Sequence, residues 1–179
     1  MICKSGVWKM KKEMKKLVQS AISGDKDAFG TLYEIYSADM YRFALSMCKN
    51  SFDAQDAVQE TVLSVFKSIH GVKNPEKFKS YLFSSLSNTC KRKLSENYHI
   101  VEFEDEGYVD SEIEFSIPVR EALSKLDEES RQILMLSIAG GFKSREIGEM
   151  LDISANTVRT KHKRALEKMR EELSLWTRR

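Results

Sequence analysis

Apolar residues recur every three or four positions along most of this chain, which is the spacing of an α-helix with one buried face. The helices predicted in the first half cover residues 9–22, 53–69 and 76–96, together with a segment that starts at residue 25 or 27 and ends near residue 49. Within that segment the chain is expected to bend into a new helix at residues 37–39. The side chains expected to point inward are Phe29, Leu32, Tyr33, Tyr36, Tyr41, Phe43, Ala44, Leu45, Met47, Val58, Val62, Val65, Phe66, Ile69, Phe78, Leu82, Leu86 and Leu94. Asp53 is the expected N-cap of its helix, and Pro75 disfavours helix at the preceding residue, so residues 71–75 are predicted to form a loop.

A second group of helical segments opens at Pro118. Asp127 is expected to cap a helix over residues 128–139, because its side chain can accept hydrogen bonds from the free N–H groups at a helix start. Gly140 and Gly141 are expected to end that helix, since glycine readily adopts the left-handed backbone found after helix C-termini.

Residues 144–166 have the pattern of two short helices joined by a tight turn, and the second helix is basic. Ser144 and Ser154 are the expected N-caps, and Asp152-Ile153 is the expected turn. This arrangement is the helix-turn-helix pattern, whose second helix enters the DNA major groove. Arginine and lysine suit that helix because they pair with phosphates and with guanine edges. The alternative is an ordinary helical hairpin with a solvated charged face.

Charge is distributed unevenly along the 179 residues, although the net charge is only +2. Between residues 96 and 116 there are eight Asp and Glu and no Lys or Arg, whereas residues 154–179 hold eight Lys and Arg against three Glu. The pattern indicates a basic DNA-binding module beside an acidic connector. We therefore predict an all-α protein of two small helical domains joined by an acidic linker. The predicted parts are an N-terminal helix or arm (1–24), a first domain (25–96), the linker (97–117) and a second domain (118–179).

Several functional classes are disfavoured by what the sequence lacks. Cys3, Cys48 and Cys90 form no CxxC pair, and Cys48 and Cys90, which lie in apolar helical patterns, are expected to be reduced core thiols of a cytoplasmic protein. The three histidines show no metal-ligand spacing, so neither a metal nor another cofactor is expected. No apolar run approaches the roughly 20 residues that span a bilayer, and no signal peptide is recognisable. No nucleophile–base pair, phosphate-binding loop or carboxylate cluster stands out, so we do not expect an enzyme.

Two stretches of the chain are especially distinctive. The first runs from Asp27-Ala-Phe-Gly-Thr-Leu-Tyr through Asp53-Ala-Gln-Asp-Ala-Val-Gln-Glu-Thr-Val-Leu, and the second from Leu126-Asp-Glu-Glu-Ser-Arg-Gln-Ile-Leu to about Leu173. They closely resemble bacterial sigma factors of the extracytoplasmic-function type, in the family's order of region 2, short linker and region 4. The resemblance implies a dissociable subunit that directs core RNA polymerase to a class of promoters and helps to melt them. It also implies an anti-sigma factor as a common partner.

One helix face carries acidic and amide side chains at positions i, i+3, i+6 and i+7, opposite an apolar face. These residues are Asp53, Asp56, Gln59 and Glu60. Such a face repels DNA phosphates and suits a basic protein partner, although a merely solvated face is the alternative. The resemblance implies that the partner is the clamp helices of the largest subunit of core RNA polymerase.

The resemblance also implies that region 2 captures an unstacked base of the minus-ten element. Capture of single-stranded DNA needs aromatic surfaces together with cations along the backbone. The candidate residues are Lys73, Asn74, Lys77, Lys79, Tyr81, Asn88, Lys91, Arg92 and Lys93. The chain departs from the family where Tyr81 replaces the usual Trp, Ser84 and Ser87 replace arginines, and Arg92 replaces an acid. The family's base preference at the minus-ten element is therefore not transferred to this chain. The alternative interpretation of Tyr81 is a buried aromatic residue of the core.

In region 4 the family usually has Pro where this chain has Asp127, and a Gly-Val-Pro-like turn where it has residues 152–154. Both replacements keep a helix start. The residues that the resemblance implies for minus-thirty-five recognition are Ser154, Thr157, Arg159, Lys161 and Arg164. Two other functions are considered: a stand-alone helix-turn-helix regulator with an N-terminal dimerisation or sensing bundle, and a nucleic-acid enzyme with an appended reader domain. The acidic helix face argues against the first, and the missing catalytic constellation argues against the second.

Overall fold

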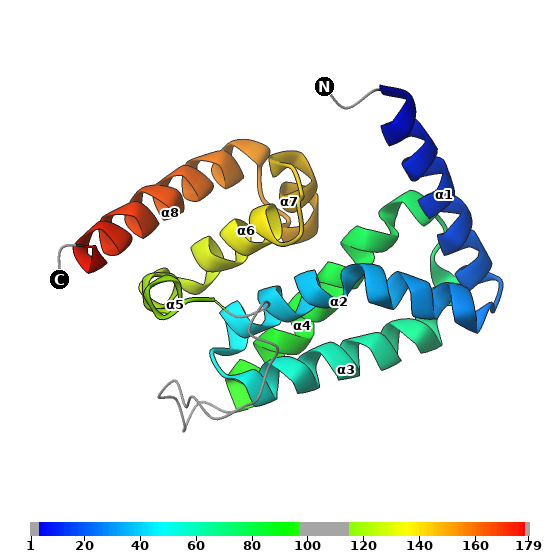
Figure 1. Cartoon of the computed structure of the whole chain (residues 1–179), viewed down its shortest axis with the longest axis horizontal. Helices are drawn as coiled ribbons and strands as arrows, with labels where there is room; N and C mark the ends of the chain where they lie inside the picture. The colour runs from blue at the N-terminus through cyan, green and yellow to red at the C-terminus, as the bar shows by residue number, and fades with distance from the viewer. Residues whose placement is uncertain (1–3, 97–114, 178–179) are drawn as a thin grey trace.

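The computed structural model describes residues 4–96 and 115–177, and every regular element in these two stretches is helical (Figure 1). The N-terminal bundle consists of α1 (Lys4–Ile22), α2 (Lys26–Cys48), α3 (Ser51–Ser68), the short 3-10 helices η1 (Ile69–Gly71) and η2 (Pro75–Lys77), and α4 (Phe78–Glu96). The C-terminal bundle consists of α5 (Ile117–Ser124), α6 (Glu128–Ile138), α7 (Ser144–Leu151) and α8 (Ala155–Trp176). The all-α prediction is confirmed. Cys3 and most of the predicted acidic linker lie outside the described residues.

Helix α2 is the central element of the N-terminal bundle and contacts α1, α3 and α4. Asp25 caps its first turn by accepting hydrogen bonds from two backbone N–H groups. The predicted bend at residues 37–39 is wrong, because α2 continues through them as one helix. The Ser37 hydroxyl donates to the carbonyl of Glu34 (3.2 Å) within the helix. No Gly or Pro interrupts residues 31–48, so a usual cause of a kink is missing.

The N-cap of α3 is Asn50, so the prediction that Asp53 caps this helix is wrong. The side-chain oxygen of Asn50 accepts a hydrogen bond from the backbone N–H of Asp53 at 2.7 Å. The Asn50 amide also donates to the Asp53 carboxylate at 2.8 Å. Both residue types cap helices well, and the preference for an aspartate placed the helix start three residues too late.

Two aromatic residues that were expected to be inward lie at the rim of the bundle. Tyr33 and Phe66 are each 39% exposed, because the buried faces of α2 and α3 are narrower than the apolar pattern suggested. Phe66 still packs edge-on against Phe29, with ring centroids 5.0 Å apart.

The helix-turn-helix forms as the sequence predicted, apart from one cap. Asp127 caps α6, Ser154 caps α8, and Asp152 adopts the left-handed backbone at φ 55° in the turn. Ser144 is the first helical residue of α7 and not its N-cap, which is Lys143. The backbone N–H of Lys143 donates a hydrogen bond to the carboxylate of Glu146 at 2.8 Å. A side chain in the first turn of α7 therefore satisfies the free N–H group at the start of the helix.

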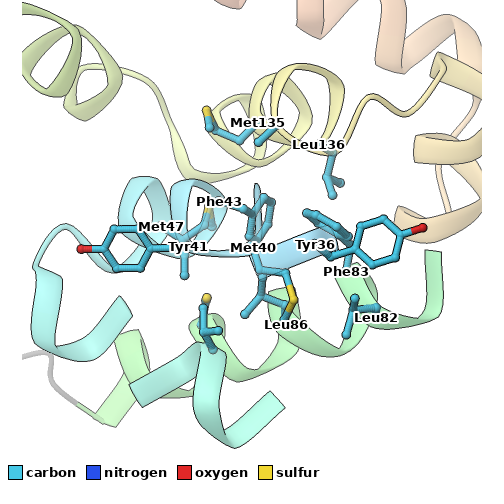
Figure 2. Packing of buried hydrophobic residues seen from close by; sticks show 14 of the residues in the cluster. Tyr36, Met40, Tyr41, Phe43, Met47, Leu82, Phe83, Leu86, Met135 and Leu136 are labelled. Carbon is cyan, nitrogen blue, oxygen red and sulfur yellow. The ribbon is translucent and has the colours of Figure 1, made fainter. Parts of the chain in front are cut away.

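The two bundles share one continuous apolar core. Figure 2 shows Met135 and Leu136 of α6 lying over residues of α2 that include Phe43 and Met40. Phe83 of α4 packs edge-on against Phe43, with centroids 6.0 Å apart. Because α6 contacts α2 and α7 contacts α4, the C-terminal bundle sits directly against α2 and α4.

We expect Asp127→Ala to lower the free energy of unfolding by about 1 kcal/mol, the usual cost of losing an N-cap. The Asp127 carboxylate accepts the backbone N–H of Ser130 at 2.9 Å, and this hydrogen bond lowers the pKa of Asp127. A lowered pKa in the folded state stabilises the fold at neutral pH, and the gain is lost as pH falls through that pKa. Thermal melts should therefore show a lower melting temperature for the variant at neutral pH and a smaller difference in strong acid. Equal melting temperatures at neutral pH would contradict this cap.

Candidate partner and nucleic-acid surfaces

The predicted acidic residues of α3 lie on the face that points away from the core. Asp56, Gln59 and Glu60 are exposed and Asp53 is half-buried. The opposite face is buried and consists of Ala54, Ala57, Val58, Thr61 and Val65. The helix therefore positions three of the four predicted docking residues for a partner outside the bundle.

Large apolar side chains flank these acids, and the sequence analysis missed them. Phe52 is 78% exposed and Leu63 is 60% exposed. Positions 52, 56, 59 and 63 share one face of a helix, so the signal was present in the spacing. Exposed large apolar residues beside charged ones are typical of a protein–protein interface.

The basic end of α4 contacts this acidic face. The Lys93 ammonium group pairs with Asp56 and lies 3.6 Å from the Glu60 carboxylate, and Arg92 also pairs with Glu60. The side chain of Lys93 is only 11% exposed, and its hydrogen bond to Asp56 raises its pKa. The structure thus brings two predicted sites together. Arg92 and Lys93, which were predicted to contact DNA, form ion pairs with acidic residues that were predicted to contact the polymerase. Lys91, on the same helix, stays exposed.

Two side-chain hydrogen bonds involve residues predicted to contact the minus-ten element, one in the loop before η2 and one in α4. The Asn74 side chain accepts the backbone N–H of Glu76 at 2.9 Å and so caps η2. Lys73 and Asn88 are exposed. Tyr81 is 37% exposed and is not a core aromatic; its hydroxyl lies 2.7 Å from that of Ser68.

Two lysines of this region reach the C-terminal bundle. Lys77 pairs with Glu149 of α7 at 3.5 Å. The Lys79 ammonium group lies 5.3 Å from the ring centroid of Phe142 and 5.5 Å from that of Tyr36. Both distances permit cation–π attraction, which holds the lysine over the rings.

An open cleft of about 830 Å³ lies beside these lysines, between α1, α2, η2 and α4. Tyr36 and Phe78 contribute to its apolar lining, and Glu146 of α7 reaches it from the C-terminal bundle. Lys15 and Glu76 pair across part of the cleft at 3.1 Å. Lys79, from the predicted melting set, therefore lines a concave surface to which both bundles contribute.

The second helix of the helix-turn-helix presents a basic face. Arg159, Lys163 and Arg164 are exposed, together with the polar residues Asn156 and Thr160 that the sequence analysis did not single out. Recognition helices contact base edges mainly through their N-terminal residues, and asparagine pairs well with adenine. The position of Asn156 in the first turn of this basic helix was the signal that could have revealed it.

Three other predicted contacts of this helix have partners inside the protein. Lys161 is half-buried and pairs with Glu129 of α6. The Ser154 hydroxyl accepts the backbone N–H of Thr157 at 3.0 Å, and the two hydroxyls lie 2.8 Å apart. These residues therefore shape the helix start and its support on α6.

Gly148 permits the tight angle between α7 and α8. A Cβ atom at this position would lie 2.6 Å from the carbonyl oxygen of Ile153, which is closer than real contacts allow. The glycine thus lets the turn pass directly over α7, and it sets how α8 is presented.

Sequence comparisons identify the family to which these surfaces belong. Residues 32–99 match the family described as Sigma-70 region 2, and residues 116–169 match Sigma-70, region 4. The RNA polymerase sigma factor SigV of Bacillus subtilis is 33% identical over 146 residues, which cover 78% of this chain and 87% of SigV. The chain is a sigma-70 family sigma factor of the extracytoplasmic-function type. It is an alternative sigma factor that directs RNA polymerase to promoters, and sigma factors are non-catalytic initiation factors.

Other relatives agree with this membership. The extracytoplasmic-function sigma factor SigW of Bacillus subtilis is 24% identical to this sigma factor, covering 92% of this chain and 98% of SigW. Among solved structures, CnrH in complex with the cytosolic domain of CnrY matches with a TM-score of 0.69 and 22% identity, covering 90% of this chain and 97% of CnrH. The sigma factor RpoE of Bartonella quintana, in complex with the anti-sigma factor NepR, matches with a TM-score of 0.68 and 18% identity, covering 82% and 96%. These structures support the helical fold.

The described residues contain no cluster of three or more potential metal ligands. No described helix is both long enough and apolar enough to span a membrane. Cys48 and Cys90 are buried free thiols. Donation of a hydrogen bond by the Cys90 thiol to the neighbouring Cys48, together with burial, raises the pKa of Cys90 far above its ordinary value, which keeps that thiol protonated and unreactive.

Proposed function

We propose that this sigma factor docks on core RNA polymerase through α3. The docking surface consists of Asp53, Asp56, Gln59 and Glu60, extended by the exposed Phe52 and Leu63. The observation that carries this proposal is the exposure of acids and large apolar residues on a single helix face, opposite a buried and mainly apolar face. A basic partner with apolar contacts at both ends complements this surface.

Promoter contacts are assigned to two further surfaces. Lys73, Lys77, Lys79, Tyr81 and Asn88 contact the melted minus-ten element, with Lys91, Arg92 and Lys93 along its backbone and Asn74 shaping the loop. The N-terminal half of α8 reads the minus-thirty-five element, with Arg159 and Arg164 as the main contacts. Ser154, Thr157 and Lys161 belong to the same predicted set and support it through the internal contacts described above.

We expect Arg159→Ala to weaken binding to the upstream promoter element by roughly 1–3 kcal/mol and to relax the base preference at one position. Arg159 is exposed in the first turns of α8, where recognition helices reach base edges. Lys163→Ala is the matched control, because this exposed cation is expected to contact phosphate and to act equally on all sequences. Binding is measured by fluorescence anisotropy of holoenzyme on native and scrambled upstream elements. If wild-type holoenzyme binds both equally, the assignment of α8 is wrong.

The structural relatives favour two additional features of the cellular role. One solved structure contains CnrH in complex with the cytosolic domain of CnrY, and the other contains the sigma factor RpoE in complex with the anti-sigma factor NepR. We extend this to the present protein and assign it an anti-sigma factor as regulator. Its site of action is the cytoplasm, where core polymerase and promoter DNA are found.

A further inference from the structure

We propose that the cleft between α1, α2, η2 and α4 binds a small amphipathic anion, in which a carboxylate or similar head group is attached to an apolar body. The volume of the cleft, about 830 Å³, lies within the range of roughly 300–1,000 Å³ that is typical of small-molecule sites. This ligand site goes beyond the polymerase and promoter surfaces proposed above. Only its expected effect on DNA binding rests on the proposed function.

Apolar side chains from each of these four elements line the cleft. They are Met14, Val18, Tyr36, Pro75 and Phe78. The rings of Tyr36 and Phe78 lie with their centroids 6.3 Å apart. Met14 is only half-buried, and methionine is flexible enough to adapt to irregular shapes. This lining therefore suits the apolar body of a ligand.

The hydroxyl of Tyr36 is a buried hydrogen-bond donor with a poor acceptor. Among the described residues it donates to the sulfur of Met14 at 3.7 Å, and a thioether accepts hydrogen bonds only weakly. Tyr36 is 8% exposed, and burial raises its pKa, so the hydroxyl keeps its proton. A carboxylate is a much stronger acceptor than a thioether. An anion in the cleft would therefore replace the sulfur as the acceptor.

The ammonium group of Lys79 places a positive charge over the same tyrosine. It lies 5.5 Å from the ring centroid of Tyr36, and the side chain is half-buried. Within the described part of the chain no carboxylate pairs with Lys79, which instead lies over the rings of Tyr36 and Phe142. Because half-burial excludes part of the water that screens its charge, Lys79 attracts an anion more strongly than a fully exposed lysine does.

The other charged groups of the lining also favour an anion over a cation. Lys15 and Glu76 pair with each other at 3.1 Å. The carboxylate of Glu146 accepts a backbone N–H at 2.8 Å at the start of α7. Lys12 is exposed and, among the described residues, has no ion-pair partner. With three lysines and two glutamates, the lining as a whole is positively charged.

Occupation of the cleft should compete with single-stranded promoter DNA. Lys79 belongs to the proposed minus-ten set, and an anion bound in the cleft would take the place of a phosphate at its ammonium group. A ligand of this class would therefore act as a negative effector of promoter melting. This consequence, unlike the site itself, depends on the proposed function.

Decanoate is a suitable probe, because it joins a carboxylate to an apolar chain. Isothermal titration calorimetry of the whole protein, without polymerase or DNA and below the critical micelle concentration, should show saturable binding of one decanoate per chain. Acetate keeps the charge but lacks the apolar body, and decanol keeps the chain but lacks the charge. Each should bind at least about tenfold more weakly, which is the usual effect of losing one charge-assisted hydrogen bond or the equivalent apolar contact.

Two variants and a matched control locate the head group. Lys79→Met keeps the apolar stem and removes the charge, and Tyr36→Phe removes only the hydroxyl. Each should weaken decanoate binding by about tenfold and leave decanol binding unchanged. Lys16→Met removes the same charge from an exposed position of α1 outside the cleft lining and should bind decanoate as the wild type does. Circular dichroism checks that each variant is folded.

Methionine methyl groups report where the probe binds. In nuclear magnetic resonance spectra of protein with isotope-labelled methionine methyl groups, the signal of Met14 should shift as decanoate is added. The signal of Met169, a half-buried residue of α8 outside the lining, should not shift. The spectrum of Met14→Leu identifies the signal of Met14.

The outcomes separate this site from the proposed function. Binding of decanoate that does not saturate, that leaves Met14 unshifted, or that is equally tight in Lys79→Met overturns the site. A single-stranded thymidine oligonucleotide should displace decanoate. A shift of Met14 with the oligonucleotide but not with decanoate would make the cleft a nucleic-acid surface and would also overturn the site. If decanoate binds as expected and the oligonucleotide does not displace it, the assignment of Lys79 to the minus-ten set is wrong, while the ligand site stands.

Discussion

Replacing Asp56 with Asn and Glu60 with Gln should nearly abolish binding to core RNA polymerase. Both side chains are exposed on α3 between Phe52 and Leu63, where we place the polymerase contact. Loss of one partner of an interfacial charge pair costs about 2–5 kcal/mol, so two losses should weaken binding by more than a hundredfold. The measurement is a titration of purified core polymerase with fluorescently labelled sigma factor.

Neutral isosteric substitutions suit this test better than charge reversal. Asp56 and Glu60 also pair with Lys93 and Arg92 of α4. Arginines at positions 56 and 60 would therefore face two cations and could disturb the α3–α4 packing. Amide substitutions keep shape and hydrogen-bonding capacity, so the variant should remain folded.

A control variant breaks the same ion pairs from the α4 side. Lys93→Met keeps the apolar stem of this nearly buried side chain and leaves both carboxylates in place. If the carboxylates themselves bind the polymerase, Lys93→Met should retain core binding. Equal loss of binding in Lys93→Met and the amide double variant would show that the packing of α3 on α4, and not the acidic face, is responsible.

The second large effect is expected in promoter melting. Lys73→Ala with Lys77→Ala should leave core binding and closed-complex formation intact but impair transcription from duplex promoters. Two lost charge-assisted contacts to the melted strand cost about 3 kcal/mol, or on the order of a hundredfold. A template with a pre-melted bubble should partly rescue transcription, because it bypasses the cost of opening base pairs.

The design of the melting variant follows from the loop contacts. Asn74 caps η2, so its replacement would disturb the loop and confuse folding with function. Lys77 also pairs with Glu149 of α7, so Lys77→Ala removes one exposed ion pair between the bundles as well as the positive charge. Lys67→Ala, at an exposed position near the end of α3, is the control for lost positive charge. Normal duplex transcription by the double variant would remove this loop from the melting mechanism.

Local rules were sufficient to predict the helix-turn-helix apart from the N-cap of α7, which is Lys143 and not Ser144. Asp127, Ser154 and Asp152 form the expected caps and turn, because each satisfies backbone groups only a few residues away. The same rules misplaced the start of α3, where Asn50 and Asp53 are both good caps and only the packing of the whole helix distinguishes them.

Contacts between distant segments were beyond what periodicity can predict. The sequence predicted two bundles and a connector, but not that Gln132 would lie against Ser87 or that Phe142 would cover Phe83. It likewise gave an outward position to Lys161, which pairs with Glu129 instead of pointing freely to solvent. A helical repeat indicates which face is buried but not which helix covers it.

The central claim is that this protein directs core RNA polymerase to promoters through the surfaces described above. The most direct measurement is transcription of fragmented genomic DNA from the source organism by purified core polymerase, with and without this protein, followed by sequencing of RNA 5′ ends. We predict a set of start sites that depends on the protein and shares two upstream elements at a fixed spacing. These start sites should be lost with the Asp56→Asn, Glu60→Gln variant. The same start sites with core polymerase alone, or none that depend on the protein, would contradict the claim.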